Sequence, residues 1–191
     1  MNRWIIFLVL ILIFYNNFRK KENFTNTKNV YLISNNSKLT DEYIKKINNI
    51  NLNHSDKVVR FNHSGNPNIF KNQTDIAFFR NNSESYWGYK LPIWNNLHNK
   101  DIVLLGKNPK TDICKSDAEK RGNNVSILDY NKVEGKTESS GTQAIKYFSN
   151  DKNINKIYLV GFTFYDGKVN WHNFEREKEI LNKYPNKVIQ L

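Results

Sequence analysis

The sequence predicts a single α/β domain in which a mostly parallel sheet is flanked by helices. Two observations support this prediction. Short, continuously apolar runs that are typical of buried strands alternate with helix-like segments from about residue 29 onward. Hydrophobic residues make up 39% and aromatic residues 14% of the 191 residues, which is enough apolar surface for the core of one domain.

The expected strands are runs of two to five residues dominated by Val, Ile, Leu and Phe. In chain order they cover residues 30–33, 57–61, 76–79, 102–105, 125–128, 157–161 and 188–189. Helices are expected at 40–50, 142–148 and 174–184. This alternation predicts a Rossmann-like sheet, and ligands of such sheets bind beyond the carboxyl ends of the strands.

The N-terminal segment is expected to anchor the chain in a membrane. Residues 4–15 are continuously apolar, Trp4 and Tyr15 bracket the run, and the basic cluster Arg19-Lys20-Lys21 follows. The run is short for a span of roughly 17–25 residues, but no small-residue cleavage site follows it, which favours an uncleaved anchor over a signal peptide. The expected organisation is a tail at 1–3, a transmembrane anchor at 4–18, a stem at 19–28 and a globular domain at 29–191.

The charge of the chain favours an anionic small ligand over nucleic acid. The net charge is +11 and the isoelectric point is near 9.6, but the basic residues are scattered through a sequence rich in Asn, Lys and Ile. No zinc-finger spacing or RNA-binding aromatic signature accompanies them, so we expect no nucleic-acid partner. A phosphate-bearing donor or an acidic acceptor would suit a basic domain.

Cys114 is the only cysteine in the sequence. The chain therefore cannot form an intrachain disulfide or a cysteine-based zinc site. We expect the thiol to be buried as a small apolar group.

Three polar stretches lie where the ligand-binding edge of such a sheet is expected. Ser34-Asn35-Asn36-Ser37 connects the first strand to the first helix, and backbone amides at such a turn favour a phosphate. The second strand ends in Arg60-Phe61-Asn62. Ser139-Ser140-Gly141 opens a helix that leads to the strand ending in Gly161-Phe162, and His172 follows. Each stretch alone also fits an ordinary turn, because no Gly-x-Gly-x-x-Gly pattern is present.

Together these stretches resemble the motifs of the eukaryotic-type sialyltransferases. The large motif of that family, Gly-Asn-Ser-(Gly/Ser)-x-Leu and later Asp-x-Val-x-Arg-x-Asn, corresponds to residues 34–39 and 56–62. The small motif matches Ser139-Ser140-Gly141 and Gly161-Phe162, and the very small motif matches His172 with Glu177. The bacterial sialyltransferases are similar in outline.

The resemblance implies a sialyltransferase-like variant of the GT-A fold and an inverting, metal-independent reaction. Sialic acid or a related sugar would pass from a cytidine-nucleotide donor to a hydroxyl of a glycan acceptor, without a further cofactor. His172 would act as general base. Arg60 and Glu177 would support the site, and the donor-binding residues would be Asn35, Ser37, Asn62, Ser139, Ser140, Gly141, Gly161 and Phe162. The absence of an Asp-x-Asp motif agrees with metal independence.

The resemblance also implies a single-pass type II protein of a Golgi-like, host or viral membrane. The excess of positive charge after the apolar run favours the opposite orientation, because only Arg3 precedes it.

The sequence departs from the family in ways that leave alternatives open. Ser34 stands where the family has glycine, the disulfide between the large and small motifs cannot form, and the interval between Asn62 and Ser139 is compact. The alternatives are a glycosyltransferase of the same fold with another nucleotide-sugar donor, and a membrane-anchored glycan-binding relic without catalysis. His172 also fits a surface or packing residue, and Glu177 fits a charge on a solvated helix.

Overall fold

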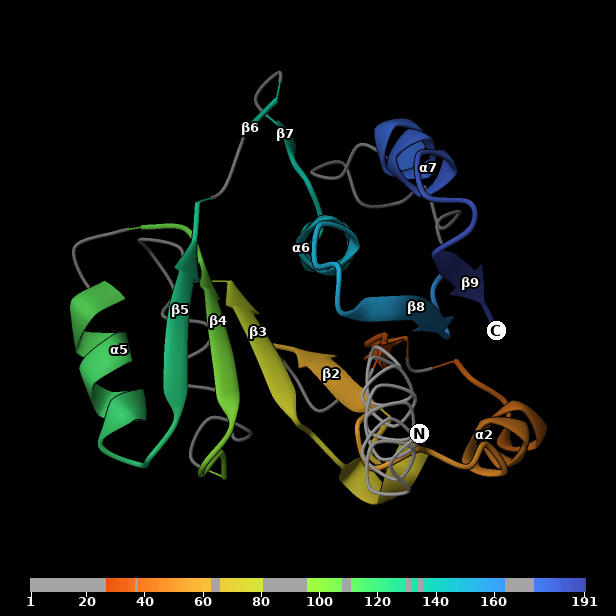
Figure 1. Ribbon diagram of the computed structural model, residues 1–191, viewed down its shortest axis with the longest axis horizontal. Helices are drawn as coiled ribbons and strands as arrows, with labels where there is room; N and C mark the ends of the chain where they lie inside the picture. Colours follow the sequence, from red (N-terminus) through yellow and green to blue (C-terminus); the bar gives the residue numbers. More distant parts are fainter. Residues whose placement is uncertain are drawn as a thin grey trace, which may run out of the picture.

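The computed structural model describes residues 27–36, 38–62, 66–80, 96–107, 111–129, 132–133, 136–163 and 174–191. Within these residues seven strands form one parallel sheet in the order β5-β4-β3-β2-β1-β8-β9 (Figure 1). Their bounds are β1 Lys28–Ile33, β2 Lys57–Phe61, β3 Ile76–Arg80, β4 Asp101–Leu105, β5 Asn124–Leu128, β8 Ile154–Val160 and β9 Val188–Gln190. A small antiparallel pair, β6 (Lys132–Val133) and β7 (Lys136–Thr137), precedes α6.

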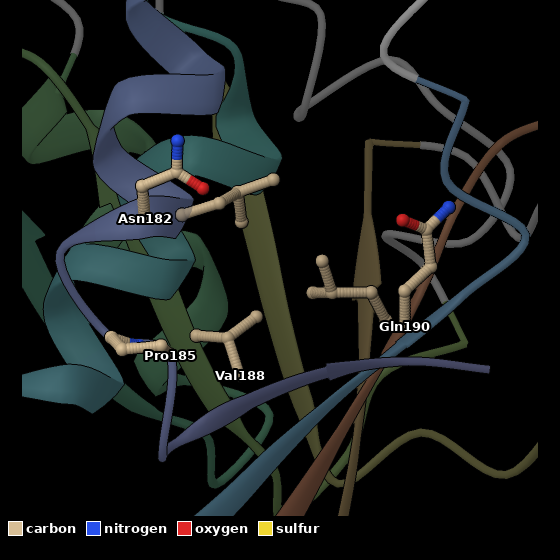
Figure 2. A pocket seen from close by; sticks show the side chains of 6 residues that line it. Asn182, Pro185, Val188 and Gln190 are labelled. Carbon is tan, nitrogen blue, oxygen red and sulfur yellow. The ribbon is translucent and has the colours of Figure 1, made fainter.

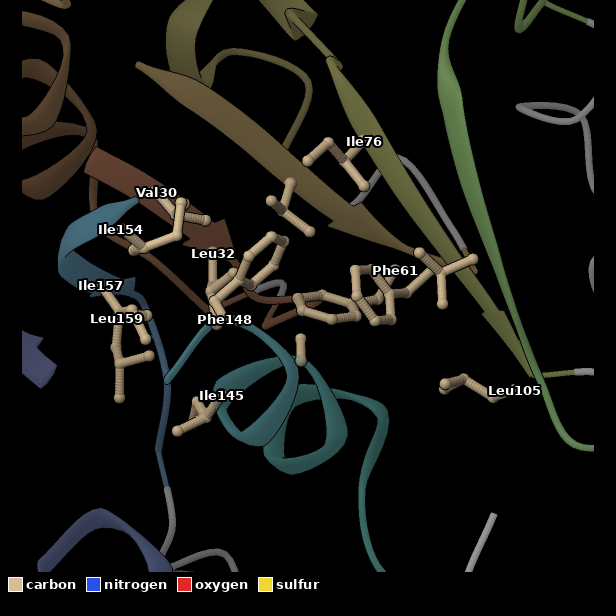
Figure 3. Packing of buried hydrophobic residues seen from close by; sticks show 14 of the residues in the cluster. Val30, Leu32, Phe61, Ile76, Leu105, Ile145, Phe148, Ile154, Ile157 and Leu159 are labelled. Carbon is tan, nitrogen blue, oxygen red and sulfur yellow. The ribbon is translucent and has the colours of Figure 1, made fainter. Parts of the chain in front are cut away.

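Helices cover both faces of the sheet. On one face lie α6 (Ser140–Ser149) and α7 (Phe174–Asn182); on the other lie α2 (Asp41–Asn48), the 3-10 helix η1 (Ile69–Asn72) and α5 (Thr111–Glu119). Alternate residues of one strand serve opposite faces. Val30 and Leu32 pack with α6 (Figure 3), whereas Tyr31 and Ile33 pack with α2. Burial on both faces explains why the strands are continuously apolar rather than alternating.

The chain reverses its direction across the sheet at β1. Strands β1 to β5 are added one after another on one side, after which the chain returns and places β8 and β9 on the other side of β1. Because crossovers between parallel strands are right-handed, this reversal also moves the connecting helices to the opposite face. The result is a topological switch point between β1 and β8, whose residues Ile33 and Val160 are register partners.

The predicted Rossmann-like α/β sheet is confirmed, and it is wholly parallel among the described strands. The strand starts differ most from the prediction, since β1 begins at Lys28 and β8 at Ile154. The sequence did not predict α5, which buries only Thr111, Cys114 and Ala118 and leaves Ile113 57% exposed, so its apolar pattern is too sparse to identify. Cys114 is buried as predicted, and burial raises the pKa of its thiol.

Candidate functional site

The carboxyl ends of β1 and β8 lie side by side at the switch point, and the stretches that contain Ser34 and Gly161 meet there. Ser34 follows β1 directly, and its Oγ donates a hydrogen bond to the carbonyl of Gly161, which follows β8, at 2.7 Å. The amide of Ser34 donates to the Val160 carbonyl at 3.0 Å. Two segments more than a hundred residues apart are thereby joined at the edge where parallel sheets bind ligands.

The loop after β1 is fixed by its own asparagines. Asn35 Nδ2 donates to the carbonyl of Phe61 at the end of β2, at 3.0 Å, and the exposed side chain keeps a second amide hydrogen. Asn36 accepts from the amide of Lys38 at 3.0 Å, which closes a local turn. Ser37 lies outside the described residues. The loop therefore sits across the ends of β1 and β2.

Gly161 is required by its backbone conformation and its surroundings. Its φ is +71°, and a Cβ there would stand 2.7 Å from Leu39 Cδ1 and 2.9 Å from Ser34 Oγ. Its amide donates to the hydroxyl of Tyr43 in α2 at 2.9 Å, and that hydroxyl donates to the carbonyl of Leu191 at 3.0 Å. The turn after β8 is thus held by Tyr43 of α2, which is itself fixed by the carbonyl of Leu191.

The start of α6 presents backbone amides at the same edge. Ser139 is the N-cap, and its Oγ accepts from the Thr142 amide at 3.1 Å while its carbonyl accepts from the Gln143 amide. The first turn of a helix leaves its amides without intrahelical partners, so within the described part of the chain those of the buried residues Ser140 and Gly141 lie unbonded at the positive end of the helix dipole. A Cβ at Gly141 would lie 2.5 Å from Phe162 Cε1, so glycine allows the helix to approach this ring.

Glu177 of α7 is directed to this helix start. Glu177 is only 2% exposed, and its Oε1 accepts a hydrogen bond from the Ser139 amide at 2.8 Å. The interpretation of Glu177 as a charge on a solvated helix is therefore wrong. The carboxylate stabilises the positive end of α6. Its negative charge also opposes the binding of a phosphate at this helix start, and cations at the same edge, such as Arg80 at the end of β3, would have to offset that repulsion.

Arg60 is buried and supports the site through backbone carbonyls of the segment between β2 and β3. It is 1% exposed, and its guanidinium donates to the carbonyls of Ile69, Gln73 and Asn66 at 2.7, 2.9 and 3.3 Å. Burial lowers the pKa of Arg60 to about 10. All three carbonyls belong to the segment between β2 and β3, so the buried cation organises that segment.

The segment held by Arg60 in turn holds the loop after β1. Asn66 Nδ2 donates to the carbonyls of Asn36 at 2.7 Å and Ser34 at 3.1 Å. Asn66 has a φ of +57°, a left-handed conformation that asparagine tolerates better than most residues. Asn62, the last residue of the second motif, also has a positive φ, and its Oδ1 accepts from the Arg80 amide at 2.8 Å. It ties β2 to β3 one strand away from β1.

Sequence reasoning missed three residues that shape this edge. Tyr43 and Asn66 act through the contacts given above, and neither carries a local signal: one lies on the apolar side of a helix, the other in a chain rich in asparagine. Glu138 is the third. It is buried, its carboxylate accepts from Lys146 Nζ and Gln143 Nε2 at 2.6 Å, and its carbonyl accepts from Arg80 Nη2 at 2.9 Å.

Some predictions fall on residues that the structure does not describe. His172, Ser37 and the tail, anchor and most of the stem at 1–26 lie outside the described residues. In the described part of the chain, no helix has the length and apolarity needed to cross a bilayer. The same residues contain no cluster of three or more His, Cys, Asp or Glu side chains suited to a metal ion.

Comparisons with protein families, curated proteins and solved structures find no match for the chain.

Proposed function

We propose that the chain is an inverting, metal-independent glycosyltransferase that resembles sialyltransferases. It transfers sialic acid or a related sugar from a cytidine-nucleotide donor to a hydroxyl of a glycan acceptor. In this proposal the fold is the sialyltransferase-like variant of the GT-A fold, and the N-terminal segment anchors the domain in a membrane as a type II protein.

One observation carries the proposal: residues that define the resemblance, although far apart in sequence, contact one another at the switch point. Ser34 of the large motif bonds Gly161 of the small motif at 2.7 Å. Gly141 packs against Phe162, and Glu177 of the very small motif bonds the amide of Ser139 at 2.8 Å. The parallel topology alone brings strand ends and helix starts to this edge, so the support lies in the types of residue that meet there.

The site geometry suggests a role for each part in donor binding. The amides of Ser140 and Gly141 would bind the donor phosphate, favoured by the dipole of α6. The second amide hydrogen of Asn35 would reach the same ligand from the loop after β1. His172 would take the proton from the acceptor hydroxyl as that oxygen attacks the anomeric carbon and the nucleotide leaves with the bonding electron pair.

Ser34 is compatible with catalysis even though it replaces the family glycine. Its side chain is 8% exposed and turned toward the Gly161 carbonyl, so the hydroxyl joins β1 to β8. The substitution that most favoured a non-catalytic relic therefore has a structural role of its own. This weakens the argument for the relic.

The proposal is tested by measuring acceptor-dependent release of cytidine monophosphate from CMP-sialic acid by the full-length chain, with a panel of glycan acceptors. Activity lost in His172→Ala and reduced in Ser140→Pro is expected, because proline removes the Ser140 amide at the first helical position, where this residue is well tolerated. Ser126→Ala, at an exposed position on the outermost strand β5, serves as a control that retains activity. Release that is equally fast in His172→Ala would refute the assigned base, and activity with only another nucleotide sugar would change the donor.

A further inference from the structure

A pocket of about 250 Å³ lies between the sheet and the C-terminal end of α7. Strands β8 and β9 form one side, and α7 with the turn that follows it forms the other (Figure 2). The lining residues are Leu159, Val188 and Gln190 from the sheet and Leu181, Asn182 and Pro185 from the helical side. None of the functional residues assigned above lines this pocket.

The chemistry of the lining selects an uncharged ligand. Four lining side chains are apolar, and the two polar ones, Asn182 and Gln190, are neutral carboxamides. The pocket also lies at the C-terminal end of α7, which ends at Asn182. The helix dipole is negative there, so a phosphate or carboxylate would be disfavoured, whereas groups that donate hydrogen bonds would be favoured.

The orientation of Gln190 adds a hydrogen-bond acceptor. Its Nε2 donates to the Phe162 carbonyl at 3.0 Å, which leaves its Oε1 to accept from a ligand. Figure 2 shows the carboxamides of Asn182 and Gln190 on opposite sides of the pocket. Apolar walls with a few placed amides are a common way to bind a small neutral molecule that carries hydroxyl groups.

Phe162 connects this pocket to the proposed donor site. Its carbonyl is bonded to Gln190, and its ring packs against Gly141 at the start of α6. Phe162 therefore contacts both a residue that lines the pocket and the helix start that is proposed to bind the donor. We propose that the pocket binds an uncharged sugar ring of the acceptor, an inference that rests on the proposed glycosyltransferase function.

The test is saturation-transfer NMR on the full-length chain with methyl glycosides of glucose, galactose, mannose and N-acetylglucosamine, alongside calorimetry with cytidine monophosphate. Val188→Phe fills the pocket, and Asn182→Ala removes one amide at an exposed helix position. Asn155→Ala is the matched control, an exposed asparagine outside the pocket lining. We expect at least one glycoside to bind, with saturable binding lost in Val188→Phe and weakened about three- to tenfold in Asn182→Ala. Asn155→Ala should bind like the unchanged chain.

The nucleotide measurement separates failure of the inference from failure of the proposed function. Unchanged binding of cytidine monophosphate in both pocket variants shows that they are folded and supports an acceptor site. If the pocket variants lose both nucleotide binding and glycoside binding, the pocket is assigned to the nucleoside instead of the acceptor. Glycoside binding that is unaffected by either variant, or absent altogether, would overturn the inference about the pocket. The titration with cytidine monophosphate would then still test the proposed glycosyltransferase function. Absence of nucleotide binding in the unchanged chain would refute the function itself.

Discussion

Replacement of Asn66 by Asp tests how the loop after β1 is held in place. The Asn66 side chain donates two hydrogen bonds, to the carbonyls of Asn36 at 2.7 Å and Ser34 at 3.1 Å. Aspartate has nearly the same shape and also tolerates the left-handed backbone, but its ionised carboxylate donates no hydrogen bond. Asn66→Asp therefore removes both bonds with little change in local backbone preference.

The expected magnitude follows from these two bonds. A typical hydrogen bond contributes about 0.5–1.5 kcal/mol, so loss of the two bonds should lower the free energy of unfolding by about 1–3 kcal/mol. Repulsion between the carboxylate and the two carbonyls would add to this loss. A loop that is no longer fixed must also be ordered when a nucleotide binds. Fixing one residue costs about 1–2 kcal/mol, so we expect affinity for cytidine monophosphate to fall about tenfold.

Chemical denaturation and calorimetry of the full-length chain measure these two effects. Asn72→Asp is the matched control, because Asn72 lies in the same segment, is exposed and has a φ of +60°. If Asn66→Asp unfolds at the same denaturant concentration as Asn72→Asp, the two bonds do not hold the loop. If stability falls but nucleotide affinity does not, the loop is not part of the ligand site.

Three further predictions concern the switch-point glycine, the buried carboxylate and a buried tyrosine. Gly161→Ala should lower stability by about 2 kcal/mol in denaturant, because of its φ of +71° and the crowding against Leu39; an unchanged midpoint would contradict this. Glu177→Ala should cost about 1.5–3 kcal/mol through its bond to Ser139, whereas Glu177→Gln, which can still accept that bond, should cost less than half as much; equal losses would mean that charge dominates. Burial, then the charge of Asp56, raises the pKa of Tyr31 from 10.0 to about 12. The folded state thus holds the proton of the Tyr31 hydroxyl more tightly than the unfolded state does. The contribution of this proton to the free energy of unfolding is fully present below pH 10 and is lost as the pH rises toward 12. The stability of the unchanged chain relative to Tyr31→Phe should fall by about 2 kcal/mol across that interval, and a constant difference would refute the assignment.

The parallel sheet could be predicted because burial on both faces produces a continuous signal in short segments. Val30-Tyr31-Leu32-Ile33 is apolar at every position since alternate side chains serve the two cores. Helix α5 lacked such a signal because little of it is buried. The strand order could not be predicted, since no local pattern states on which side of β1 the strand β8 pairs.

The site was predictable only where polar residues directly follow a strand or open a helix. Ser34, Gly161 and Ser139 lie at such positions, and the topology brings them to one edge. Asn66 and Tyr43 act through contacts between distant segments, which only the folded chain reveals. Glu177 looked like a solvated charge because charged neighbours surround it in sequence, but its carboxylate is buried and accepts a hydrogen bond from the Ser139 amide at the start of α6.

The central claim is that the edge at the switch point binds a cytidine nucleotide. Calorimetric titration of the full-length chain with cytidine, uridine and guanosine monophosphates tests it most directly, with Asn35→Ala, Ser140→Pro and the control Ser126→Ala measured in parallel. The account predicts selective binding of cytidine monophosphate that is weakened in the first two variants and unchanged in the control. Absence of binding to any of the three nucleotides, or binding that neither Asn35→Ala nor Ser140→Pro alters, would contradict it.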